Sequence, residues 1–228
     1  MITTRVSFID GMRGFSLLGI LLANLLAFQF GMFGIDELKN LSTLDTGALY
    51  FVKIFIEGSS MPIFTILFGY SLMKLIESIR KKKNKSRWSI VRRAIGLIVI
   101  GWLHSTFLWE GDILLSYGFM TLFLIPFFNR KAKTLFIWSG ILFVLSTLLS
   151  YGSMEPSKKQ QQEIDTYIAE TNTVYANGSY QEIYDYRLNV TPPGFGEPIV
   201  VGIILVLAVV LYVPMFLLGM GLAKKTRL

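Results

Sequence analysis

The stretch of sequence that decides the fold is RRAIGLIVIGWLHSTFLWEGDILLSY, which runs from Arg92 to Tyr117. Two arginines precede an apolar run at 94–109, and a turn at 110–112 leads into a second apolar run at 113–128. Each run is about 24 Å long as a helix, which is shorter than the hydrocarbon core of about 30 Å. Charged groups at that depth must be buried in protein or line a cavity. The turn therefore predicts a water-filled recess, which is the candidate functional site.

The composition is that of a membrane protein. Of the 228 residues 53% are hydrophobic, and the mean hydropathy is +0.54, whereas the apolar share of soluble domains is usually below about half. The chain has no cysteine and one histidine. This excludes a disulfide framework, a cysteine nucleophile and a thiolate or histidine-rich metal site, so no metal is expected.

Apolar runs long enough to cross a bilayer predict an all-α, polytopic membrane protein with six transmembrane helices in one membrane domain, 1–228. The second span is expected to break at the sequence Gly58-Ser59-Ser60-Met61-Pro62. The predicted spans are 14–35, 49–75, 94–109, 113–128, 134–151 and 199–223.

The distribution of charge predicts the orientation of these spans. With both termini cytoplasmic, the inner segments are 1–13, 74–93, 129–133 and 224–228, and they hold 17 of the 22 basic but only 2 of the 15 acidic residues. This matches the positive-inside rule of the cell membrane. The run RKKKNKSR at 80–87 lies between two spans, so a role at lipid headgroups is favoured over nucleic-acid binding, which we exclude.

The one long loop, 152–198, is expected outside the cell with short amphipathic helices. Ser157 is followed by Gln160 and Ser179 by Glu182. Both pairs have the spacing of a capping box, in which a serine and an acidic or amide side chain satisfy the first N–H groups of a helix. Two helices are therefore predicted, with their apolar stripes on the spans or the membrane interface.

The recess at the hairpin turn offers candidate catalytic residues. His104 lies inside a span, and imidazole exchanges a proton near neutral pH more readily than other side chains. Asp112 and Glu110 are expected to orient it or to accept a substrate proton. Glu57 is expected to face the same recess, although pairing with Lys53, four residues earlier, is the alternative. Alternatively, the histidine makes only a structural hydrogen bond between helices, and the carboxylates of the turn are ordinary charged groups on a loop at the membrane interface.

Other polar residues lie near the ends of the spans. Arg13, Arg92 and Arg93 are predicted to hold a nucleotide-bearing acyl donor, such as acyl-CoA, because arginine binds phosphate bidentately; anchoring arginines are the alternative. Asp10 and Asn24, like Glu110, are expected to be structural polar groups in the membrane. Close packing between helices is predicted for five glycines: Gly69, Gly96, Gly101, Gly219 and Gly221.

Five stretches together resemble, in order along the chain, the YeiB-like family of bacterial multi-pass membrane proteins. They are FIDGMRGFSLLGILLANLL at 8–26, EGSSMPIFTILFGYS at 57–71, RRAIGLIVIGWLHSTFLWEGDILLSYG at 92–118, YANGSYQEIYDYR at 175–187 and MFLLGMGLAKK at 215–225. The opening D-G-x-R-G is also similar to integral-membrane acyltransferases that acylate extracytoplasmic sugars and to the lysosomal heparan acetyltransferase group. The resemblance implies a distant kinship to transmembrane acyltransferases.

Two departures from these families bear on the expected site. The sugar O-acyltransferases have a histidine fourteen residues after the motif aspartate, where this chain has Asn24. An amide cannot serve as a general base, so His104 would have to take that role. Members of the YeiB-like family also usually continue beyond the sixth span, and this chain is expected to be shorter than they are.

Three functions fit these features. The first is an acyltransferase-like enzyme, in which Arg13, with Arg92 and Arg93, holds a cytoplasmic acyl donor, and His104 deprotonates a hydroxyl acceptor from outside. The second is a transporter that uses the same groups as a proton relay, although no inverted repeat is evident. The third is a non-catalytic membrane subunit.

Overall fold

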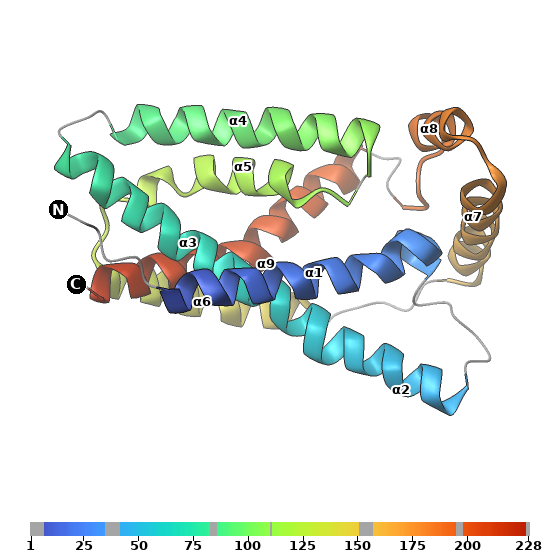
Figure 1. The fold of residues 1–228 in the computed structure, drawn as a ribbon, viewed down its shortest axis with the longest axis horizontal. Coiled ribbons are helices and arrows are strands. Elements are labelled where there is room, and N and C mark those ends of the chain that lie inside the picture. Colours follow the sequence, from blue (N-terminus) through green and yellow to red (C-terminus); the bar gives the residue numbers. More distant parts are fainter. Residues whose placement is uncertain are drawn as a thin grey trace. The chain divides into compact units, whose positions relative to one another are not determined.

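The computed structural model describes residues 7–34, 42–82, 86–109, 111–150, 157–194 and 198–226, and every regular element among them is a helix (Figure 1). The α-helices are α1 (Ser7–Gly34), α2 (Thr43–Phe51), α3 (Gly58–Lys81), α4 (Ser86–Phe107), α5 (Ile113–Phe123), α6 (Ala132–Ser150), α7 (Lys158–Asn177), α8 (Tyr180–Asn189) and α9 (Pro198–Lys225). A π-helix, Val52–Glu57, joins α2 to α3, and a 3-10 helix, Ile125–Phe127, follows α5.

The described residues contain five helical stretches long and apolar enough to cross a membrane. They are Phe8–Leu26, Thr43–Lys81, Arg87–Phe107, Ala132–Leu149 and Leu207–Lys225. On α1 these apolar side chains are exposed at five leucines: Leu17, Leu18, Leu21, Leu22 and Leu25. The predicted all-α architecture with long apolar helices is therefore confirmed.

The helix in the predicted span 113–128 is shorter than expected. α5 ends at Phe123 after 11 residues, which is about 16 Å and well below the thickness of the hydrocarbon core. Pro126 lies at the start of the 3-10 helix that follows, and proline cannot donate the backbone N–H that would continue an α-helix.

The break predicted at 58–62 is wrong. α3 begins at Gly58 and runs through Pro62 without interruption, and the irregular backbone lies one turn earlier, in the π-helix. Pro62 lacks the N–H that would bond to the carbonyl of Gly58. The chain accommodates that missing bond with wider turns before it, where the N–H of Gly58 bonds to the carbonyl of Lys53.

The chain forms two compact units, and the first comprises Met1–Phe64 and Gly152–Leu205. In this unit α1 lies close to the start of α3 at Gly19, which has no side chain. A Cβ at that position would collide with the hydroxyl of Ser60. Both predicted capping boxes are formed, at Ser157 before α7 and at Ser179 before α8. The hydroxyls of Thr171 and Tyr186, 3.0 Å apart, join these two helices.

The second unit comprises Thr65–Tyr151 and Val206–Leu228. Its buried side chains come from α3, α4, α5, α6 and α9. Three rings, Phe68, Tyr117 and Phe216, meet edge to face with centroids 5.0 to 5.6 Å apart. The hydroxyl of Tyr117 lies 2.7 Å from that of Thr65. This unit therefore combines aromatic packing with a buried hydrogen bond.

Glycines allow close helix contacts in the second unit. A Cβ at Gly69 would collide with the carbonyl of Phe216, and one at Gly219 with the carbonyl of Ile66. A Cβ at Gly101 would collide with the backbone nitrogen of Leu115, and one at Gly221 with the ring of Phe136, so the prediction is confirmed for these four positions. It is wrong for Gly96, where no atom of the described residues lies within 4 Å of an added Cβ.

Candidate functional site

The candidate site lies at the turn of the hairpin formed by α4 and α5, which run antiparallel and side by side (Figure 1). The helices touch at two glycines. A Cβ at Gly101 would collide with the backbone nitrogen of Leu115, and one at Gly118 would lie 2.9 Å from the carbonyl of Ala94. Small residues thus bring the two helices into close contact both beside the turn, at Gly101, and farther from it, at Gly118.

Asp112 begins α5 and is nearly inaccessible, with 1% of its side chain exposed. Its Oδ1 accepts a hydrogen bond of 2.7 Å from the backbone N–H of Leu115, which makes it the N-cap of the helix. A capping carboxylate satisfies a backbone donor that has no partner within the helix, and it lies at the positive end of the helix dipole. The position of Asp112 is therefore fixed by its own helix.

His104 lies in the last turn of α4, and its Nδ1 is 2.9 Å from Oδ2 of Asp112. Its carbonyl accepts hydrogen bonds from the N–H groups of Leu108 and Trp109, where the helix ends. The negative end of one helix dipole therefore lies beside the imidazole, and the positive end of another beside the carboxylate. Each side chain thus lies at the helix end that attracts its charge.

The contact between His104 and Asp112 has the distance of an ion pair without the angle of a linear hydrogen bond. Nδ1 of His104 and Oδ2 of Asp112 are both buried, and neither makes a well-aligned hydrogen bond to a described residue. A carboxylate beside Nδ1 favours the tautomer that carries its proton there, which leaves Nε2 as the proton acceptor. Because 39% of the histidine side chain is exposed, a substrate has access to the ring.

This arrangement is suited to general base catalysis. A buried carboxylate that orients an accessible imidazole is the second half of a nucleophile–base–orienter set, in which the imidazole takes a proton from a hydroxyl. Among the described residues no three histidine, cysteine or acidic side chains are grouped to hold a metal ion. The pair itself can move a proton without one.

Several predicted residues belong to the first unit, whereas His104 belongs to the second. Arg13 lies 3.5 Å from Asp10, three residues earlier in α1. Asn24 is half-buried in the same helix, and Glu57 is exposed at the end of the π-helix. The ion pair in α1 leaves 35% of each side chain exposed, so Arg13 remains accessible to a ligand.

Two further candidates share α4 with His104. Arg92 and Arg93 are exposed, and they precede the histidine by twelve and eleven residues, which places them about 17–18 Å away along the helix. A ligand that touches both ends of α4 must therefore be long. Glu110 lies outside the described residues.

Sequence reasoning missed a basic pocket at the other end of the second unit. Its volume is about 440 Å³, and it is lined by Met73, Glu77, Arg80, Asn129, Arg130, Lys131, Ala132 and Lys224. The basic residues among them belong to three segments that the sequence placed in the cytoplasm as topological signals. Lysine and arginine at the ends of spans are typical of any membrane protein, so no local sequence pattern distinguished the basic residues of the pocket from ordinary basic residues at span ends.

Comparison with known proteins identifies three relatives. YxaH of Bacillus subtilis (strain 168) is 29% identical over 195 residues, which cover 81% of this chain and 48% of that protein. A 39.9 kDa protein in the amylase 3′ region of Bacillus acidopullulyticus is 30% identical over 62% of this chain and 39% of its own length. YeiB of Escherichia coli (strain K12) is 32% identical over 50% of this chain and 29% of its own length.

All three relatives are named as uncharacterized proteins, so their names assign no activity. The matched regions span about half or less of each relative's length. No family model matches the chain, and no solved structure matches it significantly. The chain is a distant homologue of YeiB and of these two Bacillus proteins.

Proposed function

We propose that this chain is an acyltransferase-like membrane enzyme, which moves an acyl group from a cytoplasmic donor such as acyl-CoA to a hydroxyl acceptor on the outer side. The observation that carries the proposal is the contact between His104 and the buried, helix-capping Asp112. Resemblance of the opening D-G-x-R-G motif to that of transmembrane acyltransferases supports the choice of acyl transfer.

In the proposed reaction, Nε2 of His104 accepts the proton of the acceptor hydroxyl. The hydroxyl oxygen then attacks the thioester carbonyl carbon, and the carbon–sulfur bond breaks. The leaving thiolate takes the proton from the imidazolium, which restores the base. Asp112 orients the ring through the carboxylate oxygen beside Nδ1, and Glu57 is a further proposed catalytic carboxylate.

We propose six spans with both termini cytoplasmic, and α5 (Ile113–Phe123) lies in the fourth of these spans despite its length. The basic pocket supports this topology, because its lining comes from the end of α3, from the segment 129–132 and from the end of α9. All three segments belong to the side assigned to the cytoplasm. A return of the chain through α5 is what brings the segment 129–132 back to that side.

The proposed donor spans the length of α4. Its phosphates bind at Arg92 and Arg93, and its acyl end reaches His104. An acyl-CoA suits this arrangement because a long flexible arm separates its phosphates from the thioester. The hydroxyl acceptor then enters from the outer side, at the hairpin turn.

The test compares acyl-CoA turnover by purified, reconstituted chain before and after His104→Gln, with Ser116→Ala on the exposed face of α5 as the control. Released thiol is measured in the presence of candidate acceptor sugars. The proposal expects turnover that His104→Gln abolishes while insertion and thermal unfolding stay unchanged. A carrier would instead show proton-coupled uptake that depends on His104, with no acylated product. Equal turnover in the wild type and His104→Gln would refute the assigned base.

A further inference from the structure

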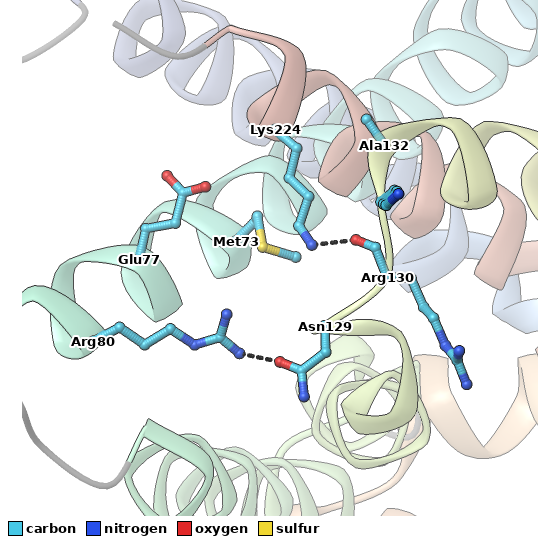
Figure 2. Close-up of a pocket in the computed structure, with 8 residues that line it drawn as sticks. Met73, Glu77, Arg80, Asn129, Arg130, Ala132 and Lys224 are labelled. Atoms are coloured by element: carbon cyan, nitrogen blue, oxygen red, sulfur yellow. Dashed lines mark hydrogen bonds between the residues drawn. The ribbon is translucent and has the colours of Figure 1, made fainter.

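The basic pocket of the second unit is built from side chains and backbone far apart in sequence. Arg80 comes from the end of α3, Lys224 from the end of α9, and Asn129 from the segment between the 3-10 helix and α6. Figure 2 shows the head groups of Arg80 and Lys224 entering the pocket from opposite helices, while the guanidinium of Arg130 points away. Two cations thus enter one cavity.

Arg80 is held in a defined orientation. Its Nη2 donates a hydrogen bond of 2.5 Å to Oδ1 of Asn129. A guanidinium has five N–H donors in a rigid fork, and one donor is used in this bond. No carboxylate of the described residues lies within ion-pair distance of Arg80. The carboxylate of Glu77, one turn earlier in α3, pairs with Lys74, whose Nζ lies 3.8 Å from Oε2 of Glu77. The remaining donors of the fork are available to a ligand.

Lys224 fixes the shape of the pocket. Its Nζ donates hydrogen bonds to the carbonyls of Phe128, at 2.9 Å, and of Arg130. These bonds tie the segment that carries Asn129 to the end of α9.

The charge of the pocket selects an anion. Four of its side chains are basic and one is acidic: Arg80, Arg130, Lys131 and Lys224 against Glu77. A planar fork and an ammonium in the lining of one pocket match the several acceptor oxygens of a phosphate. The volume of about 440 Å³ lies in the range of small-molecule sites, so it accommodates a phosphate together with the group that bears it.

We propose that this pocket binds a phosphate group, with Arg80, oriented by Asn129, as its principal contact and Lys224 as the second cation. The phosphate belongs either to an acidic phospholipid headgroup or to a soluble phosphorylated molecule of the coenzyme A type. Either source reaches a pocket at the cytoplasmic end of the helices. The inference uses none of the residues of the proposed acyl transfer and does not depend on it.

The experiment has one arm for each source. In the first, the full chain in phosphatidylcholine nanodiscs is titrated with coenzyme A by calorimetry. In the second, the chain is reconstituted in mixed phosphatidylcholine and phosphatidylglycerol, and native mass spectrometry counts the phosphatidylglycerol molecules it retains. Binding in the first arm alone, when Arg80→Gln weakens it, identifies a soluble ligand of this pocket, because Arg80 lies outside the donor site proposed at Arg92 and Arg93. Retention in the second arm alone, when Arg80→Gln reduces it, identifies a lipid headgroup.

Three variants test the assigned contacts. Arg80→Gln is expected to weaken binding about tenfold or more, as the loss of a charge-assisted hydrogen bond does. Arg80→Lys, which keeps the charge but loses the fork, is also expected to bind more weakly. Asn129→Ala keeps every charge and is expected to cause a smaller loss. The matched control is Arg87→Gln, an exposed arginine outside the pocket, which should bind as the wild type does.

The proposal is overturned by a folded wild type that binds in neither arm, by unchanged binding in Arg80→Gln, or by an equal loss in Arg87→Gln. The last result would mean that only net charge matters. Tryptophan fluorescence during thermal unfolding verifies that each variant is folded. His104→Gln should retain the phosphate site, so a failure of the acyl-transfer proposal stays distinguishable from a failure of this one.

Discussion

Replacing Asp112 by asparagine separates its two roles. Oδ1 of Asp112 accepts the N–H of Leu115, and Oδ2 faces Nδ1 of His104. Asparagine is as good an N-cap as aspartate, so the introduced amide should keep its oxygen on Leu115. Its NH₂ group must then face the histidine. A donor at that position requires Nδ1 to be an acceptor, which moves the ring proton to Nε2 and removes the base.

The size of each effect follows from these contacts. Asp112→Asn should leave stability almost unchanged, whereas Asp112→Ala should lose the cap, at a cost of about 0.5–2 kcal/mol. Both should reduce any histidine-dependent turnover by about 10²–10⁴-fold, the usual contribution of a general base. The alanine variant is the matched comparison, because it removes the cap as well as the charge.

The assay does not need a known substrate. His104 is the only histidine of the chain, so nitrogen-15 labelling of histidine gives a spectrum of one imidazole, in which the protonated nitrogen is identified directly. We expect the Nδ1–H form in the wild type and the Nε2–H form in Asp112→Asn. An Nε2–H form in the wild type, or identical spectra for the two proteins, would refute the reasoning.

Three further predictions concern packing, pH and a buried hydrogen bond. Gly101→Ala should destabilise the chain by about 1–3 kcal/mol through overpacking, because its Cβ would collide with the backbone of α5; Gly96→Ala, with free space around it, should be neutral or slightly stabilising in the same thermal unfolding assay. Glu182 accepts hydrogen bonds from the N–H and hydroxyl of Ser179, which lower its pKa. The stabilisation of α8 by the Glu182 carboxylate should therefore be complete above the ordinary glutamate pKa and be lost as the pH falls through the lowered pKa. Amide hydrogen exchange in α8, corrected for intrinsic rates, should show this loss of protection. Glu182→Gln should remove the pH dependence. The hydroxyl of Ser139 donates a buried hydrogen bond of 2.7 Å to the carbonyl of Pro214, so Ser139→Ala should lower the free energy of unfolding by about 0.5–1.5 kcal/mol. Thr147→Ala, which removes an exposed hydrogen bond, should lower it less; equal losses would contradict the prediction.

The features that sequence predicted well are local. The capping boxes of Ser157 and Ser179 depend on residues three positions apart, so the pattern and the structure contain the same information. The closeness of His104 and Asp112 could also be predicted from the sequence, because Asp112 follows His104 by only eight positions. A tight turn between two apolar runs brings such positions together. Their catalytic roles stay predictions, because proximity does not specify a reaction.

The features that sequence could not predict depend on packing between distant segments. Arg80 and Asn129 are 49 residues apart, and Lys224 is 94 residues from Arg130, so no periodicity relates them. The error at Gly96 has the same origin, because a glycine in an apolar run does not reveal which face meets a neighbour. The misplaced break near Pro62 is different: proline marks where a helix bond is lost, but the surrounding turns decide where the backbone adjusts.

The crossing of α3 and α9 determines more than packing. Gly69 and Gly219 hold these helices in backbone contact, and the same helices continue to Arg80 and Lys224. Lys224 follows Gly219 by five residues, about one and a half turns, so the spacing of the two helices at the glycines sets the spacing of the two cations. A methyl group at Gly219 would widen the gap between them. A residue with no side chain, which touches no ligand, would in this way determine the size of anion that the pocket accepts.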